Sequence, residues 1–522
     1  MNKTKTSIGK DSTPHSRYFH LPLIGITACL VFLSIGSGSI TLEKLWDPTY
    51  TSTDEPKMSE RLQTEMLALG DVKKTMPIWI YFRDKGITSQ AMLITEYENV
   101  REGLRPHCLW RRAKVRNPEA PVDSHDLPLR ATYTKKMKPM VNRVRTVSRW
   151  LNAMSVEATA AQIQELEKLE FIRKLDLVVA FQRIEVHSSL SMAEDQSVRE
   201  SSNLDYGQSF TQLDQIKVLP LHASGYSGQD VVVCILDTGF RKSHEIFQHS
   251  RLIAEWDFVN ADNDVQQDMD DPEDYTDSHG TGTWSVLGGY NPGELIGPAF
   301  NAEIILGKTE TTRFERPIEE DYWVAAIEWA ESLGAEVVSS SLGYTDWYIF
   351  EDLDGETAVI TIAANRASSL GIVVVNAAGN ERDDPWGHII TPSDGFDVIA
   401  VGAVDRTGRL ASFSSPGPTA DGRIKPDVCA MGVNNWLASN NQDGTDVYRN
   451  GSGTSFATPL VAGVAALLLE VHRDWTPAQV KEALTKSADR SFSPNNDYGW
   501  GIINAELAAT WNMKKGKKGP IR

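Results

Sequence analysis

At 522 residues the chain is longer than one ordinary domain, so a small domain beside a larger one is the expected organisation. Apolar residues make up 41% of the chain, as in soluble proteins, and its formal charge of −18 excludes a general nucleic-acid binder. Four cysteines are too few for a disulfide scaffold, and they leave oxidising and reducing compartments both open.

The N-terminus has the layout of an export signal. Basic residues precede a mostly apolar run over residues 21–35, and small residues follow it at 36–39. The run is short for a membrane span, which needs about 20 residues. We therefore predict a signal peptide or N-terminal anchor over residues 1–40, with retention through residues 21–35 as the alternative to cleavage. Lipidation at Cys29 and a buried helix of the fold are further interpretations.

A small α+β module is expected over residues 77–186. Residues 78–82 have the composition of a strand, and residues 171–179 read as another. Between them Thr159 opens a helix, because Gln162 follows three residues later and completes a capping box.

Linkers flank this module, and its charge differs from that of the rest of the chain. We predict linkers over residues 41–76 and 187–204, the second because it is polar, rich in serine and without periodicity. Residues 101–149 carry thirteen Lys and Arg against four acids, a net +9, which leaves −27 for the rest. Two parts of opposite sign can dock on each other, although a solvated basic face is the alternative.

Residues 205–512 are expected to form a larger α/β domain, followed by a basic tail over 513–522. Continuous apolar strands alternate there with helices, as in a parallel sheet that is covered on both faces. The strands are predicted at 231–236, 335–338, 371–375 and 398–401, and the helices at 321–333 and 356–370. Ligands bind at the carboxyl ends of such strands, so residues just after each strand are the candidates for function.

Three residues are candidates for chemistry. Asp237 follows the first strand within Asp-Thr-Gly, a motif that aspartic proteases also use; no second copy occurs here, and a helix cap or turn residue is the structural alternative. His279 precedes a short apolar segment, where a cap or surface histidine is common. Ser455 stands at the start of a buried helix, after Gly453 and before Pro459, which we place within about the first turn. A plain N-cap is its alternative.

Together the three residues indicate nucleophilic catalysis. A serine hydroxyl needs a histidine to take its proton, and the histidine needs a carboxylate that fixes its tautomer. The chain order Asp237, His279, Ser455 is the order found in subtilisins, and no Gly-x-Ser-x-Gly elbow is present.

Five motifs in order resemble those of the subtilase family of serine proteases, over roughly residues 206–509. They are VVVCILDTGF at 231–240, HGT at 279–281, SSSLG at 339–343, AAGN at 377–380 and GTSFATP at 453–459. The resemblance implies a three-layer α/β subtilisin-like fold with a mainly parallel sheet, preceded by a small α+β, ferredoxin-like propeptide domain. It also implies a serine endopeptidase that works through an acyl-enzyme.

The same resemblance implies roles around the triad. Asn380 would donate to the oxyanion together with the Ser455 backbone N–H, although a turn residue is its structural alternative. An extended substrate would pair, as an additional strand, with the two segments that follow the predicted strands 335–338 and 371–375. The substrate-binding residues implied are Ser341, Leu342, Gly343, Ala378 and Gly379.

The small module would then be a propeptide that assists folding, caps the cleft and is removed by a cut within residues 187–204. We expect a secreted or extracytoplasmic monomer that acts on proteins or peptides, binds its own propeptide and binds no nucleic acid. The chemistry needs no cofactor. The acidic loop 262–277 is either a structural Ca²⁺ site or a solvated loop. A protease-like protein that only binds peptides is the alternative function.

Overall fold

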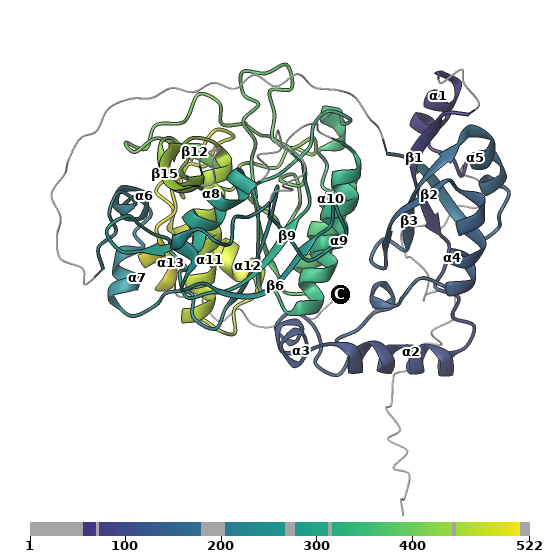
Figure 1. The fold of residues 1–522 in the computed structure, drawn as a ribbon, viewed down its shortest axis with the longest axis horizontal. Helices are drawn as coiled ribbons and strands as arrows, with labels where there is room; N and C mark the ends of the chain where they lie inside the picture. Colours follow the sequence, from purple (N-terminus) through teal and green to yellow (C-terminus); the bar gives the residue numbers. More distant parts are fainter. Residues whose placement is uncertain are drawn as a thin grey trace, which may run out of the picture.

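The computed structural model describes residues 56–68, 73–178, 204–266, 277–311, 316–440 and 445–511. Within them a small and a large unit lie side by side (Figure 1). The predicted signal or anchor at 1–40, almost all of the predicted linker at 187–204 and the basic tail at 513–522 lie outside the described residues.

The small unit is a four-stranded antiparallel sheet with the order β2-β3-β1-β4. Helices join β1 to β2 and β3 to β4, which is the ferredoxin-like arrangement that the resemblance implies. The strands are β1 (Thr75–Phe82), β2 (Arg143–Ser148), β3 (Ala153–Thr159) and β4 (Ile172–Leu177); the helices are α2 (Gln90–Gly103), α3 (Pro106–Ala113), η2 (Ser124–Asp126), α4 (Ala131–Met137), η3 (Lys138–Met140) and α5 (Ala160–Glu167).

The capping box in this unit forms as predicted. Gln162 N donates to Thr159 Oγ1 over 3.3 Å, and Thr159 N donates to Gln162 Oε1 over 2.8 Å, so α5 begins where the sequence places it. The prediction of a linker over residues 41–76 is wrong for its described part. Helix α1 (Glu60–Ala68) lies there, and its Leu62 is fully buried in the core of the small unit.

The large unit is built on a seven-stranded sheet with the order β13-β12-β11-β10-β5-β9-β6, in which every pair is parallel. Its strands are β5 (Val232–Asp237), β6 (Arg251–Asp257), β9 (Glu303–Lys308), β10 (Val337–Ser340), β11 (Val373–Ala377), β12 (Ile399–Val404) and β13 (Val428–Met431). Two small hairpins are added, β7 (Tyr290–Asn291) with β8 (Leu295–Ile296) and β14 (Asn435–Asn440) with β15 (Asp446–Gly451).

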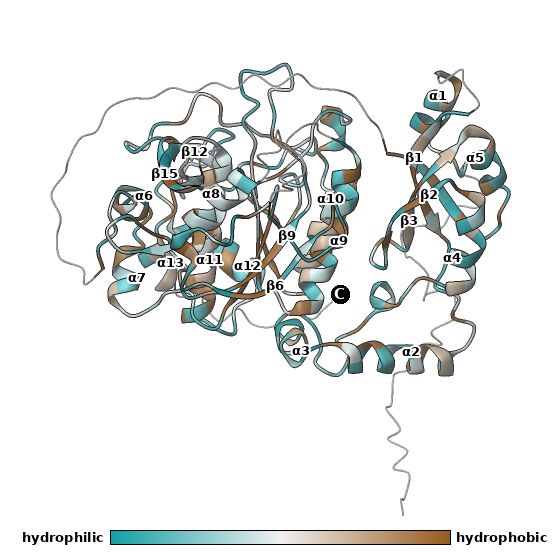
Figure 2. Ribbon diagram, in the orientation of Figure 1, coloured by the Kyte–Doolittle hydropathy of each residue, from teal (hydrophilic) through white to brown (hydrophobic). Residues whose placement is uncertain are grey.

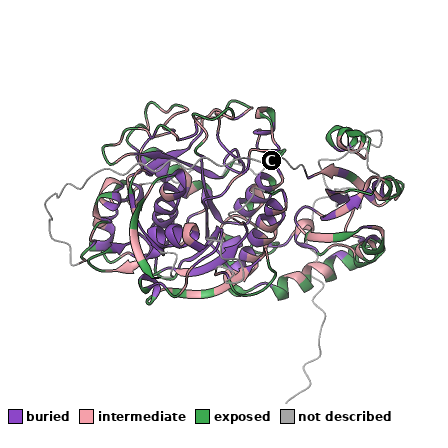
Figure 3. Cartoon of the chain, turned by 45° about the horizontal axis from the view of Figure 1, so that its top comes forward, coloured by how far each residue is buried: buried purple, intermediate pink, exposed green. Residues whose placement is uncertain are grey.

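Helices cover both faces of this sheet, which gives the three layers implied by the resemblance. Alternate residues of β5 show why its sequence is apolar throughout: Val233 and Ile235 pack with α8 and α11, whereas Cys234 and Leu236 pack with α9 and α10. Figures 2 and 3 show the strands as hydrophobic and buried. The helices are α6 (Phe210–Gln215), α7 (Leu219–Ala223), η4 (Glu245–Phe247), α8 (Asp277–Gly288), α9 (Ile318–Leu333), η5 (Phe350–Asp352), α10 (Val359–Ser369), α11 (Thr454–Val471), α12 (Pro477–Ser487) and α13 (Ala505–Ala509).

Helix α11 is the core helix of the large unit. Among the described helices it alone is long and apolar enough to cross a membrane, but it packs against β10, β11, β12 and β13. Fifteen of its residues are buried, so its apolar composition is explained by this packing.

Candidate active site

The candidate residues gather at one edge of the sheet because neighbouring parallel strands end there. Val337 of β10 pairs with Val233 of β5 on one side and with Val373 of β11 on the other. The carboxyl ends of these three strands therefore carry Asp237, the segment 341–343 and the segment 378–380 at one edge.

Asp237 is the fully buried last residue of β5, and its carboxylate orients His279 on α8. Asp237 Oδ1 lies 2.7 Å from His279 Nδ1 and also accepts from Thr238 N over 2.8 Å. A carboxylate only accepts in this contact, so Nδ1 carries the imidazole proton and Nε2 is left as the acceptor. This is the tautomer that a general base requires.

Thr283 completes the support of Asp237, a role that the motifs of the sequence did not indicate. Its Oγ1 donates to Asp237 Oδ2 over 2.9 Å. Thr283 stands four residues after His279 and so lies on the same face of α8, which is the sequence signal that points to it. Helix α8 comes this close because residue 280 is glycine: a Cβ there would lie 2.0 Å from the Gly239 oxygen.

The pKa of His279 reflects two opposing effects. Burial disfavours the imidazolium, but the adjacent Asp237 carboxylate outweighs burial and raises the pKa of His279 above its ordinary value. The side chain still exposes about a third of its surface, so it remains accessible from the solvent side.

Ser455 is the second residue of α11 and is 9% exposed. Pro459 is the sixth residue of this helix and so lies in its second turn, about half a turn beyond the first turn in which we placed it. A proline there has no N–H for the Ser455 carbonyl, four residues before it. The Ser341 hydroxyl replaces that donor over 2.8 Å, and this contact fastens the start of α11 to the end of β10.

Ser455 and His279 are neighbours, but no hydrogen bond joins their side chains in the part of the chain that the structure describes. Ser455 Oγ instead donates to the Ser341 carbonyl over 3.3 Å. The His279 ring packs against Phe456, the residue after Ser455, with 5.6 Å between ring centroids. The Ser455 hydroxyl hydrogen must therefore turn away from the Ser341 carbonyl before His279 can accept it.

Asn380 is exposed and lies beside the first residue of α11, Thr454. Its Oδ1 accepts from Thr454 N over 2.9 Å and from Thr454 Oγ1 over 3.1 Å. Because Oδ1 is held this way, the amide Nδ2 is the group left to donate. Gly379, with φ +107°, turns the chain here and donates its N–H to Thr454 Oγ1 over 3.3 Å.

The predicted substrate-binding residues differ in their accessibility. Ser341 and Leu342 are buried. The main chain of Gly343 makes no hydrogen bond within the described structure, so it is free to pair with an extended peptide. The implied role of Ala378 meets an obstacle, because its N–H donates to Val401 O and its carbonyl accepts from Ile390 N, over 2.9 and 3.0 Å.

The described residues contain no group of three or more His, Cys, Asp or Glu side chains placed to hold a metal ion. Residues 267–276 of the acidic loop lie outside the described part. Calcium binding at that loop stays a prediction, as does chemistry without a cofactor.

Comparisons with known proteins agree with this arrangement. The profile of the subtilase family matches residues 228–501, and that of the peptidase S8 propeptide domain of Bacteroidota matches residues 77–197. Subtilisin E of Bacillus subtilis (strain 168) is 31% identical over 376 residues, which cover 70% of this chain and 83% of that relative. Subtilisin of Bacillus pumilus is 34% identical over 304 residues, which cover 57% and 97%.

A solved structure supports the fold. Fervidolysin from Fervidobacterium pennivorans, described as a keratinolytic enzyme related to subtilisin, superimposes with a TM-score of 0.56 and 21% sequence identity. The match covers 84% of this chain and 62% of that one. At this identity the likeness concerns the fold alone.

Proposed function

Because the chain belongs to the subtilase family and is a serine-type endopeptidase with a propeptide, we propose that Asp237, His279 and Ser455 are its catalytic triad. The observation that carries the proposal is the 2.7 Å hydrogen bond between Asp237 and His279, at the sheet edge where α11 begins with Ser455. We further propose that the enzyme is made as a zymogen and acts outside the cytoplasm.

The reaction is acyl transfer. The Ser455 hydroxyl hydrogen turns away from the Ser341 carbonyl, and Oγ attacks the carbonyl carbon of the scissile peptide bond while His279 Nε2 accepts the proton. His279 then gives this proton to the leaving amine, and the acyl group remains on Ser455 as an ester. Water, deprotonated by His279, hydrolyses the ester, and Asp237 stabilises the imidazolium in both halves.

Asn380 is assigned to the oxyanion. We expect Asn380→Ala to lower kcat by about 10² to 10³ with little change in KM, since the donor acts on charge that develops in the transition state; this range was measured on a subtilisin. Steady-state kinetics on a fluorogenic peptide checks it. Asn301→Ala is the control. Asn301 lies just before β9, at the opposite edge of the sheet, and its amide Nδ2 donates to Ser227 Oγ. A kcat equal to that of the unchanged chain would remove Asn380 from the oxyanion site.

Maturation is tested by the mass of the purified protein. We expect the active chain to lose its N-terminal module through a cut within residues 187–204, where the sequence is polar and without periodicity. Intact mass spectrometry of fresh and incubated protein measures this loss. A chain that hydrolyses peptides at full length would contradict the zymogen proposal.

We propose export because the first forty residues have the layout of an export signal. We propose that the enzyme acts as a monomer because its arrangement is subtilisin-like. Protein substrates and the chain's own propeptide are its partners, and nucleic acid is not among them. Fractionation of the producing cells, with N-terminal sequencing of the enzyme, tests export. A full-length chain in the cytoplasm would contradict it.

A further inference from the structure

Two glycines in the segments that follow β10 and β11 contact one and the same side chain, that of Ile390. A Cβ on Gly343, in the segment after β10, would lie 2.5 Å from Ile390 Cδ1. A Cβ on Gly379, in the segment after β11, would lie 2.7 Å from Ile390 Cγ2. Both distances are shorter than the contacts that real Cβ atoms make. The Ile390 side chain therefore fills the room between the two segments.

The glycine at position 343 is explained by this contact and not by its backbone. Gly379 has a φ of +107°, which favours glycine, but Gly343 is not among the glycines with positive φ. A larger residue at 343 could adopt the same backbone, yet its Cβ would also lie 2.5 Å from Thr391 O. A glycine with an ordinary backbone commonly marks a place where another group approaches closely.

The main chain holds Ile390 in this place. Ile390 N donates to Ala378 O over 3.0 Å, which fastens residue 390 to the segment after β11. Tyr344 N donates to Thr391 O over 3.2 Å, which fastens the next residue to the segment after β10. The Ile390 side chain is 7% exposed, and its branched Cβ restricts the rotation about χ1. A bound peptide therefore meets a fixed wall.

The proposed chemistry places the substrate beside this wall. The attacked carbonyl carbon must lie at Ser455 Oγ, and its oxygen must lie at Asn380 Nδ2. Ser455 Oγ is 3.3 Å from Ser341 O, two residues before the first glycine, and Asn380 directly follows the second glycine. The residue that supplies the carbonyl, on the amino side of the cut bond, therefore lies between the two segments. We call it the P1 residue.

We propose that Ile390 determines the specificity of the enzyme at P1. The Ile390 side chain occupies the room that a large P1 side chain would need, so the substrates are proteins and peptides with a small residue before the cut bond: alanine, glycine or serine. This inference rests on the proposed function, which supplies the position of the attacked carbonyl.

The sizes of the groups give the expected effect. Leucine has three more carbon atoms than alanine, and Ile390→Ala removes three carbon atoms from the wall. One methylene group too many in an apolar pocket already lowers kcat/KM by about 10- to 200-fold. For the unchanged enzyme we expect kcat/KM for a peptide with leucine at P1 to be at least about 100-fold below that for alanine. In Ile390→Ala the leucine side chain takes up the vacated room, and the ratio shifts towards leucine by about 100-fold.

The test compares two fluorogenic peptides that differ only in alanine or leucine at P1. The full chain is matured, and kcat/KM is measured for both peptides in the unchanged enzyme and in Ile390→Ala. Thermal unfolding shows whether the variant is folded. Ile362→Ala is the matched control, because it removes the same three carbon atoms from an exposed isoleucine of α10 and should leave the ratio unchanged.

A second variant and a second measurement keep the test decisive if Ile390→Ala does not fold. Ile390→Val removes only the Cδ1 carbon, and we expect it to shift the ratio towards leucine by about 10-fold. The unchanged enzyme can also digest a denatured protein, and mass spectrometry of the released peptides identifies the residue before each cut without any substitution. We expect alanine, glycine and serine there.

Two results would overturn the inference while the proposed function stands. One is cleavage after leucine or phenylalanine as readily as after alanine by the unchanged enzyme. The other is an unchanged ratio in folded variants of Ile390. Hydrolysis of neither peptide, nor of the denatured protein, would instead overturn the triad assignment and this inference with it.

Discussion

Replacing Ser455 by alanine should lower peptide turnover by about 10⁶, the cost of removing the nucleophile from a subtilisin. Without Oγ no acyl-enzyme can form, and only the oxyanion donors and substrate binding remain to assist attack by water. The measurement is hydrolysis of a fluorogenic peptide library by the chain freed of its propeptide. A gel of both proteins before the propeptide is removed should show that the alanine variant no longer shortens itself.

The control is Ser452→Ala, three residues earlier. That side chain is exposed, and among the described residues its one hydrogen bond is accepted from Asn434 N, over 3.0 Å. Its loss should therefore leave turnover within a factor of about two. An alanine variant at 455 that retains a tenth of the activity would mean that another residue is the nucleophile.

Asp237→Asn should lower kcat by about 10⁴. An amide in place of the carboxylate can donate to Nδ1 of His279, which stabilises the tautomer that has its proton on the wrong nitrogen. The change keeps the size and shape of the buried side chain, and its amide oxygen can still accept from Thr283 Oγ1 at the Oδ2 position, so we expect a loss of proton transfer and not of folding.

The pH profile gives a second reading of the same variant. His279 acts as a base only when neutral, so kcat/KM falls as pH drops through its pKa. Asp237 raises that pKa above the ordinary 6.5. Without the carboxylate, burial and the Arg449 charge both lower the pKa, and the acid limb should move to lower pH. Asp214→Asn, an exposed partner of Lys217, is the control. An acid limb that stays in place would show that Asp237 does not govern His279.

Local signals in the sequence located much of the fold. The capping box at Thr159 and Gln162 fixed the start of α5, because both hydrogen bonds of that motif lie within four residues. Apolar runs with glycine or polar residues at their ends gave the strands that position Asp237 and Asn380, since a strand buried on both faces needs no polar alternation. Strand β9 was missed because its apolar run covers only residues 304–306.

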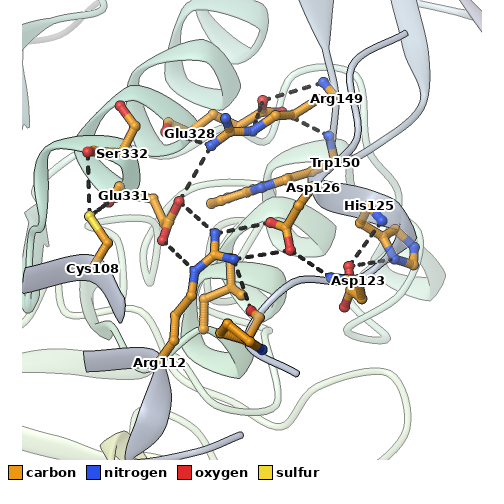
Figure 4. A network of polar contacts seen from close by, with 12 residues as sticks. Cys108, Arg112, Asp123, His125, Asp126, Arg149, Trp150, Glu328, Glu331 and Ser332 are labelled. Atoms are coloured by element: carbon orange, nitrogen blue, oxygen red, sulfur yellow. Dashed lines mark hydrogen bonds and ion pairs between the residues drawn. The ribbon is translucent and has the colours of Figure 1, made fainter. Parts of the chain in front are cut away.

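Contacts between distant segments could not be predicted in this way. The hydroxyl of Ser341 replaces the donor that Pro459 lacks, yet these residues are more than a hundred positions apart and meet only because β10 and α11 pack together. The pairing of Arg112 with Glu331 (Figure 4) spans 219 positions. Charge counting indicated that residues 101–149 dock on the acidic remainder, but only the fold shows that the termini of α9 and α10 receive them.

The most direct measurement is covalent labelling of the nucleophile. The chain freed of its propeptide is treated with a fluorophosphonate, which traps an activated serine, and the modified residue is located by mass spectrometry of the digested protein. We expect one adduct, on Ser455, that forms far more slowly in Asp237→Asn. Peptidase activity that survives while Ser455 stays unmodified, or an adduct on another serine, would contradict it.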